Sequence, residues 1–272
     1  MKCLLLIEVL FVILVQYAPQ AMAQTEALDS LNRVLNLTED SNQKIKNLVL
    51  IANELRLIDK QKAWNVAESA LVLASTSDDD QGLASALTTK GLLSEDSDDY
   101  PQALNFYTEA LTIYKNTESR ADIARLHSLL GSVYKTMGNY EKAIENCLEA
   151  LKIYEQRGDQ SGIAQLYRIM GSIYKYKGDY EKSLFYYFSG LKINEEIGNL
   201  SGVANSYNNI GVTYIMMNEP DKALGYYHKS LDINKSMNYD SEAAINYGNI
   251  GVAYRQLGQM DSAIFYLEQR HN

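Results

Sequence analysis

Residues 161–200 read SGIAQLYRIM GSIYKYKGDY EKSLFYYFSG LKINEEIGNL and contain two amphipathic patterns. In the first half, beginning at Ile163, apolar side chains recur at steps of three and four, which is the spacing of one helix face. Gly178 then interrupts the pattern, and a second apolar face runs from Tyr180 until Gly198. The stretch therefore predicts a pair of helices joined by a tight turn.

The pattern repeats along the chain with a period of 40 residues. A fixed period of this length is typical of proteins built from stacked structural repeats. Four residue columns carry the period: Gly91, Gly131, Gly171, Gly211 and Gly251; Ala84, Ala124, Ala164, Ala204 and Ala244; Leu71, Leu111, Leu151, Leu191 and Leu231; Tyr134, Tyr174, Tyr214 and Tyr254.

The residues between the helices are also periodic. The positions that end helices hold Gly or Asn, the residues that enter the left-handed conformation at low cost. These are Gly138, Gly158, Gly178, Gly198, Asn218, Asn238 and Gly258. The positions that open the second helices are Asp59, Asp99, Asn139, Asp179, Glu219 and Gln259, of which the first four are good N-caps.

These columns predict an all-α solenoid of antiparallel helix pairs. Neither helix of a pair can bury its apolar face alone, so neighbouring repeats must stack. Gly and Ala mark close helix crossings, and Tyr and Leu fill the space between helices. The expected repeats are 41–80 (degenerate, with Ile51 in the Gly column), 81–120, 121–160, 161–200, 201–240 and 241–272 (truncated). A short capping helix is expected within residues 24–40.

The repeat resembles the tetratricopeptide signature over roughly residues 41–272. Two copies carry the resemblance: Tyr167, Met170, Gly171, Tyr174, Gly178, Tyr180, Ser183, Tyr187 and Gly190; Tyr207, Ile210, Gly211, Tyr214, Ala223, Tyr227 and Ser230. The resemblance implies a right-handed superhelix whose concave face is lined by the first helix of each repeat, and a role in binding proteins.

Two features depart from the common form of that family. The usual period is 34 residues, and six extra residues add about 9 Å of helix per repeat. Where a Pro usually closes the second helix, this chain has Glu155, Glu195 and Lys235. This 40-residue form is similar to a longer-helix subclass found in peptide-binding adaptors and bacterial regulators. The chain also resembles exported bacterial tetratricopeptide proteins and the extracytoplasmic part of sensor kinases of that family.

Residues 1–23 have the pattern of a secretory signal peptide. Lys2 precedes an apolar run, and Ala21-Met22-Ala23 fits the small-x-small cleavage site. The apolar run is shorter than the roughly 20 residues that span a bilayer. We therefore expect export to the periplasm or the extracellular space. The alternative is a leader that is kept as a membrane anchor; apart from that case, no membrane contact is expected.

Composition disfavours nucleic acid and gives no sign of catalysis. The net charge is −9, whereas nucleic-acid binding needs a positive surface. His127, His228 and His271 do not have metal-ligand spacing, and no nucleophile or phosphate-binding motif occurs. We predict no enzyme activity, no cofactor and no metal. His127 and Cys147 are predicted to be packed in the core.

Two acidic runs, 78–80 and 95–99, allow a calcium-binding interpretation. They lack the loop pattern of a calcium hand and fall between predicted helices. We therefore expect them to act as solvated helix caps.

The candidate binding surface is the concave face implied by the family resemblance. Over residues 121–257, the first helices carry six basic residues (Arg125, Lys135, Arg168, Lys175, Lys177 and Arg255) against two acidic ones (Asp122 and Glu242). A protein or peptide partner with acidic residues or a free C-terminal carboxylate would complement this face. The candidate groove residues are Arg125, Lys135, Arg168, Lys175, Asn205, Asn209, Asn249 and Arg255.

Asn209 and Asn249 stand two residues before the Gly column. In peptide-binding arrays of the family an Asn at this position clamps the ligand backbone, whereas Leu129 and Ile169 hold it in the neighbouring repeats. The alternative is that both Asn side chains bond only within the solenoid.

Two functions fit these observations. The first is an exported scaffold that binds a peptide or protein in its concave groove. The second is the extracytoplasmic input region of a truncated or split bacterial signalling protein, either a histidine kinase or a transcriptional regulator.

Overall fold

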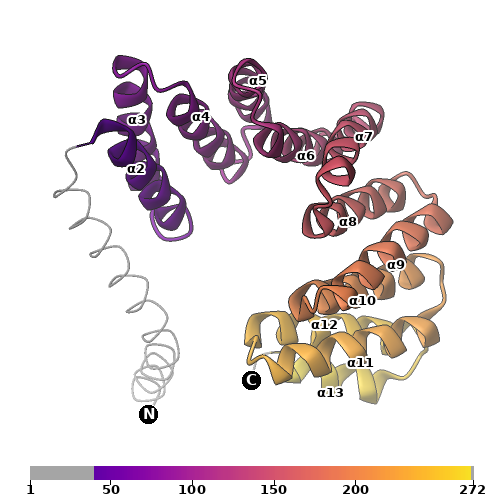
Figure 1. Cartoon of the computed structure of the whole chain (residues 1–272). Helices are drawn as coiled ribbons and strands as arrows, with labels where there is room; N and C mark the ends of the chain where they lie inside the picture. Colours follow the sequence, from indigo (N-terminus) through magenta and orange to yellow (C-terminus); the bar gives the residue numbers. More distant parts are fainter. Residues whose placement is uncertain (1–39, 271–272) are drawn as a thin grey trace, which may run out of the picture. The chain divides into compact units, whose positions relative to one another are not determined.

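The computed structural model describes residues 40–270. The expected leader (1–23) and, apart from its last residue, the expected capping helix (24–40) lie outside the described residues. Within them all regular secondary structure is helical, and successive helices form antiparallel pairs (Figure 1), which confirms the predicted fold class. The helices are α2 (Ser41–Leu55), α3 (Lys60–Thr76), α4 (Asp80–Glu95), α5 (Tyr100–Asn116), α6 (Arg120–Thr136), α7 (Tyr140–Arg157), α8 (Gln160–Tyr176), α9 (Tyr180–Glu196), α10 (Leu200–Met216), α11 (Pro220–Ser236), α12 (Asp240–Gln256) and α13 (Met260–Gln269).

The chain divides into two compact units. The N-terminal unit ends at Asp122 and contains α2–α5; the C-terminal unit begins at Ile123, in the first turn of α6, and contains the helices from there to α13. In both units helices pack on their neighbours in sequence, as α4 does on α5 and α8 on α9. All the predicted groove residues belong to the C-terminal unit.

Turns follow each other at a constant spacing. Within residues 40–270 ten residues have a positive φ, and they recur every 20 residues from position 78 to position 258. In the C-terminal unit they are the Gly and Asn residues that the sequence predicts. In the N-terminal unit Asp78, Asp98 and Glu118 adopt the same conformation, with φ of 52°, 58° and 55°. The left-handed region costs a non-Gly residue roughly 1–2 kcal/mol, so these turns were not expected from residue type.

The predicted helix caps are confirmed. The side chains of Asp59, Asp99, Asn139 and Asp179 each accept a hydrogen bond from a backbone N–H three residues on, at 3.0–3.2 Å. Glu219 and Gln259 make no such bond. The first acidic run supplies a further cap, because Asp79 Oδ1 accepts from the Gly82 N–H at 2.9 Å. Both acidic runs thus lie at turns, as predicted.

The Gly column marks the crossing of the two helices within a pair. A Cβ on Gly171 would lie 2.7 Å from the ring of Tyr187, and one on Gly211 would lie 2.5 Å from the ring of Tyr227. Both rings are fully buried. Burying an aromatic side chain contributes about 1.5–3 kcal/mol, and here it depends on the missing methyl group of the glycine opposite.

Three repeats fill this crossing differently. In the last of them, α12 and α13, a Cβ on Gly251 would lie 2.8 Å from Leu267 Cγ. In α2 and α3 the large and the small residue are exchanged. Ile51 takes the place of the glycine, Ala67 takes the place of the tyrosine, and both are buried in the same core cluster. In α6 and α7 a Cβ on Gly131 would lie 2.9 Å from Cys147 Sγ. Cys147 is buried, as predicted, and burial raises the pKa of its thiol to about 12, although the charge of Lys135 acts in the opposite direction. The thiol is therefore a packing group.

Tyrosines outside the crossings stack between helices. The rings of Tyr174 and Tyr186 lie 5.4 Å apart at an angle of 10°, and those of Tyr214 and Tyr226 lie 5.5 Å apart at 12°. In the repeat before these, Asn146 stands at the position of Tyr186 and its Oδ1 lies 2.9 Å from Nδ1 of His127. His127 is only partly buried and makes this polar contact, so the structure does not place it in the core as predicted.

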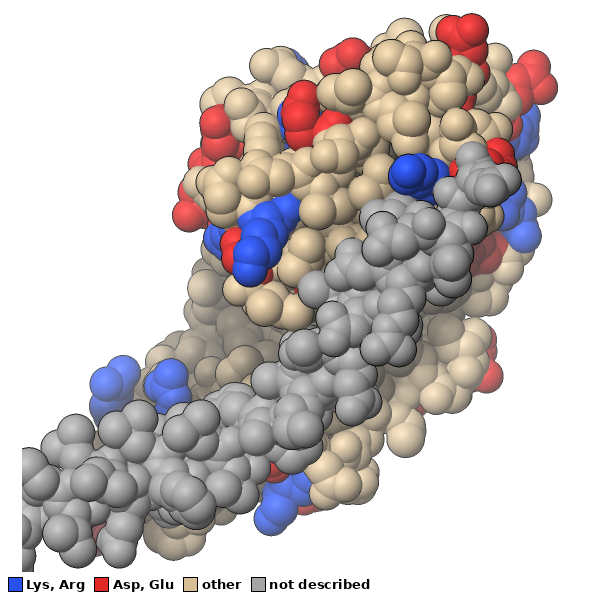
Figure 2. All heavy atoms as spheres, turned by 90° about the vertical axis from the view of Figure 1, so that its left-hand side faces the viewer, with Lys and Arg blue, Asp and Glu red and all other residues tan. Residues whose placement is uncertain are grey.

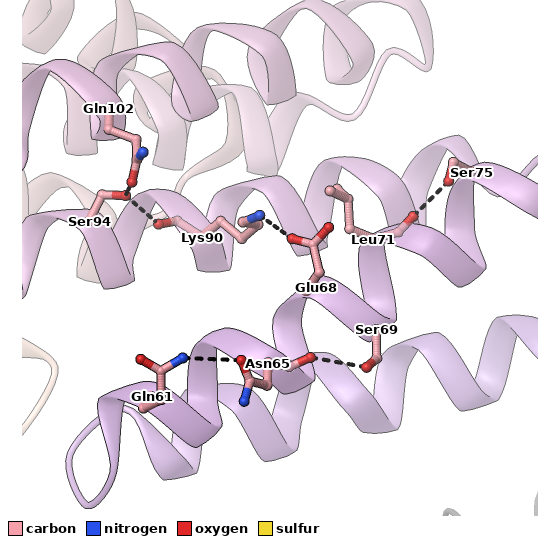
Figure 3. A network of polar contacts seen from close by, with 9 residues as sticks. All are labelled: Gln61, Asn65, Glu68, Ser69, Leu71, Ser75, Lys90, Ser94 and Gln102. Atoms are coloured by element: carbon pink, nitrogen blue, oxygen red, sulfur yellow. Dashed lines mark hydrogen bonds and ion pairs between the residues drawn. The ribbon is translucent and has the colours of Figure 1, made fainter.

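A charged residue occupies a core position of the N-terminal unit. Lys90 is at the position that holds Met170 in a later repeat, and it is 6% exposed. Its ammonium group pairs with Glu68 of α3 (Figure 3). The ammonium nitrogen also lies 4.4 Å from the ring centroid of Trp64 and 5.1 Å from that of Phe106. The pairing offsets part of the desolvation of the charge.

Candidate functional site

A polar pocket lies between α8 and α10 in the C-terminal unit. Its volume is about 420 Å³. The first turns of α10, the middle of α8 and the last turn of α9 form its walls. The lining residues are Ala164, Gln165, Arg168, Asn194, Asn199, Ser201, Gly202, Asn205 and Ser206. Arg168 and Asn205, two of the predicted groove residues, are thus brought to one cavity.

The pocket exists because two bulky columns change residue type at this point. Asn194 stands 40 residues after Tyr154, which is buried between the preceding helices. Ser206 likewise stands 40 residues after Leu166, a fully buried core residue. Smaller polar side chains at both positions leave space where the preceding repeat is filled.

Asn199 organises the rim of the pocket. It is the N-cap of α10, and its Oδ1 accepts from the Gly202 N–H at 3.0 Å. Its Nδ2 donates to Oδ1 of buried Asn194 at 3.0 Å. These bonds fix both amide groups, and they place the N-terminal end of α10 at the pocket.

Positive charge dominates the pocket. Arg168 is exposed and is the one formally charged residue among the lining residues. The N-terminus of α10 adds the partial positive charge of a helix end. Amide and hydroxyl groups of Gln165, Asn205 and Ser201 surround them. Each of these amide and hydroxyl groups can accept a hydrogen bond as well as donate one. The positive charge of Arg168 and of the helix end is what favours a ligand with acceptor oxygens.

Lys135 and Lys175 form a second cationic position, at the C-terminal ends of α6 and α8. Lys175 is partly buried, and this burial lowers the pKa of its ammonium group. The charge of Lys135 lowers the pKa of Lys175 further. Two lysines on adjacent first helices are thus close enough to repel each other, and a bound anion would relieve that repulsion.

The predicted Asn clamps use their amide nitrogens within the chain. Asn209 Nδ2 donates to the carbonyl of Asn205 at 2.9 Å, within α10. Asn249 Nδ2 donates to Oδ1 of Asn208 at 2.8 Å and so links α12 to α10. These bonds fit the intramolecular alternative for the donors, and the clamp remains a prediction.

The other predicted groove residues lie apart from the pocket. Arg125 is exposed on α6 and Arg255 is exposed on the last turn of α12. Lys177, counted among the basic residues of the first helices, follows α8 and pairs with Glu141 of α7 at 3.2 Å. Glu141 lies on the second helix of a repeat, so Lys177 directs its charge away from the first helices. It should not have been counted among the basic residues of the concave face.

Sequence reasoning missed several residues of the pocket, namely Asn194, Asn199, Ser201 and Ser206. The available signal was the change of a column, from Tyr114 and Tyr154 to Asn194 and Asn234. Where a column changes from a large to a small residue, either a neighbouring side chain becomes larger and fills the space or a cavity remains.

On the face in Figure 2 the acidic and basic side chains are interspersed where undescribed residues do not cover them. No group of three or more His, Cys, Asp or Glu residues within residues 40–270 could hold a metal ion. Over the same residues, no helix is both long and apolar enough to cross a membrane.

Repeated helix pairs with glycine crossings and αL turns define a helical-repeat protein. The chain belongs to the tetratricopeptide repeat family, whose sequence profile matches residues 122–196 and 202–272. A comparison with curated proteins found no match.

Several solved structures share the fold. BtubC (BKLC) from P. vanneervenii is 21% identical with a TM-score of 0.65, over 84% of this chain and 89% of that one. A signal transduction ATPase with a tetratricopeptide repeat sensor, from Pyrococcus horikoshii, is 20% identical with a TM-score of 0.70, over 93% of this chain and 40% of that one. NprR in complex with its cognate peptide NprX is 16% identical with a TM-score of 0.67, over 99% of this chain and 78% of that one. At these identities the similarity concerns the fold.

Proposed function

We propose that the chain is an interaction scaffold that binds a peptide segment of a partner protein along the first helices of its C-terminal unit. The observation that carries the proposal is the pocket between α8 and α10, with Arg168 as its one charged residue and Asn205 on its wall. Membership of the tetratricopeptide repeat family and the fold shared with peptide-bound NprR support it. The role is binding and not catalysis.

The bound segment carries acidic residues or ends in a free carboxylate. Arg168, the N-terminus of α10 and the pair Lys135 and Lys175 offer positive charge on neighbouring helices. Carboxylates bound by such groups make charge-assisted hydrogen bonds, which are stronger than neutral ones. An extended segment could meet both positions, since peptide-recognition grooves hold several side chains at once.

The test begins with selection of binding peptides from a displayed random library on the full chain. The selected peptide is then titrated against the chain and against the triple variant Arg168→Glu, Lys175→Glu, Arg255→Glu. We expect at least tenfold weaker binding, which corresponds to about 1.4 kcal/mol. The matched control makes the same charge change on second helices, with Lys152→Glu, Lys192→Glu and Lys235→Glu, all three exposed. Equal affinity of the two triple variants would rule out the basic groove.

Export is a further part of the proposal. Residues 1–23 would direct the chain to the periplasm or the extracellular space, and cleavage after Ala23 would leave Gln24 first. N-terminal sequencing of the protein from its native compartment tests this, and an intact Met1 would exclude cleavage.

The second candidate is the input region of a signalling protein. The observation in its favour is the fold shared with the Pyrococcus horikoshii signal transduction ATPase, which has a tetratricopeptide repeat sensor. Purification of the native protein with its covalently linked or bound output domain would favour this candidate over a free-standing scaffold.

A further inference from the structure

Asn194 lines the pocket, and in the two preceding repeats its position holds a tyrosine, Tyr114 or Tyr154. In the N-terminal unit the hydroxyl of Tyr114 lies 2.9 Å from Oγ of Ser85 on α4. In the C-terminal unit the ring of Tyr154 lies against Gly162, and its hydroxyl accepts from Ser128 of α6 at 3.4 Å. A phenol ring thus passes from a second helix to the preceding first helix, where a polar group meets its hydroxyl.

Asn194 occupies only the inner part of the equivalent space. Its Cγ would lie 2.5 Å from a Cβ on Gly202, as the Tyr154 ring carbons would from a Cβ on Gly162. An Asn side chain ends several atoms before a phenol does, so the outer part of the space stays open. That part extends to Arg168, which stands 40 residues after Ser128.

The next repeat shows that the opening is specific to this junction. Asn234 also replaces the tyrosine, but Asn246 of α12 lies against it and accepts from its Nδ2 at 2.7 Å. Asn246 stands 40 residues after Ser206, whose shorter side chain leaves the pocket between α8 and α10 open. Loss of the tyrosine is therefore compensated at one junction and left uncompensated at the other.

From this internal comparison we propose that the pocket receives a tyrosine side chain of the bound peptide, in the place of the missing internal tyrosine. The ring would lie over Ala164 and the end of Asn194, and its hydroxyl would accept a hydrogen bond from Arg168. A phenol fills more of this pocket than a carboxylate alone does, and unfilled space forfeits packing contacts. The proposal rests on the proposed function, because the tyrosine belongs to the bound segment.

The test uses p-cresol, the side chain of tyrosine as a free molecule, with the full chain. Heteronuclear NMR should show shifts of the backbone amide signals of Ala164 and Gly202, with a dissociation constant on the order of 1 mM for so small a ligand. Toluene supplies the ring without the hydroxyl, and butyrate supplies a carboxylate without the ring. Both should bind at least threefold more weakly.

Asn194→Tyr fills the pocket from within and should weaken p-cresol binding at least tenfold. The variant should fold, because Gly202 can accommodate the ring as Gly162 accommodates Tyr154; circular dichroism checks this. If it does not fold, Ser206→Leu narrows the same pocket with the residue type of Leu126 and Leu166. Asn116→Tyr makes the same change at an exposed position of α5 and should leave binding unaltered.

Three outcomes would overturn the tyrosine subsite. These are absence of p-cresol binding to the wild-type chain, equal binding to Asn194→Tyr, and tighter binding of butyrate than of p-cresol at the pocket signals. None of them affects the charge dependence of peptide binding, so failure of the subsite can be told from failure of the groove.

Discussion

At the scale of single residues, the fold depends on which glycines face another side chain. Gly171 in α8 is covered by the ring of Tyr187, whereas a Cβ on Gly225 in α11 would meet no atom within 4 Å. Both glycines lie inside helices. The first is therefore needed for packing, and the second has no such role.

Gly171→Ala should lower the free energy of unfolding by about 2–3 kcal/mol, because the added methyl group must displace a buried ring. Gly225→Ala should raise it by roughly 0.5–1 kcal/mol, because alanine loses less backbone entropy in a helix. Urea denaturation followed by circular dichroism measures both. A similar loss in the two variants would show that helix propensity and not the crossing controls stability here.

Residue type alone predicted the turns of the C-terminal unit but not those of the N-terminal unit. Gly and Asn identify αL positions, whereas Asp78, Asp98 and Glu118 do not, and only the 20-residue spacing locates them. The pocket could not be predicted for a related reason. The pocket is space that the small side chains of Asn194 and Ser206 leave empty. The size of that space depends on how all the surrounding side chains pack, and no single residue determines it.

At the scale of helices, α3 and α4 are joined by an ion pair in which Lys90 is buried at a core position and Glu68 is half exposed. Lys90→Met should leave the free energy of unfolding unchanged or raise it by about 1 kcal/mol, because apolar side chains commonly replace buried ion pairs without loss. Met also contacts aromatic rings favourably, as it would at Trp64 and Phe106. Chemical denaturation followed by circular dichroism is the measurement.

Glu68→Gln is the complementary change. It leaves the Lys90 charge buried with no carboxylate, and we expect a loss of about 1–2 kcal/mol, moderated because Glu68 is 48% exposed and screened by water. If Lys90→Met is the more destabilising of the two, the ammonium group has a structural role beyond its pairing with Glu68.

At the scale of the whole chain, the 40-residue period predicts which deletion the fold tolerates. Removal of residues 161–200 joins Gln160 to Ser201 and keeps Asp159 three residues before Gly202, as an N-cap requires. We expect the same helical signal per residue and a cooperative thermal transition. Repeat proteins tolerate such loss because each repeat contacts its neighbours.

Removal of 34 residues, 161–194, is the control. It brings the turn at Gly158 within a few residues of the turn at Gly198, so no full helix separates them. This variant should lose helical signal or its cooperative transition. Equal behaviour of the two deletions would contradict a fixed 40-residue structural repeat.

The position of Trp64 has a consequence for spectroscopy. It is the single tryptophan of the chain, and it lies in the N-terminal unit with its ring 6.1 Å from that of Phe106. Stacked tyrosines such as Tyr174 with Tyr186 belong to the C-terminal unit. Tryptophan emission therefore reports on the N-terminal unit, and near-ultraviolet tyrosine ellipticity reports chiefly on the C-terminal unit. Comparison of the two signals shows, without any label, whether the two units unfold together or in separate steps.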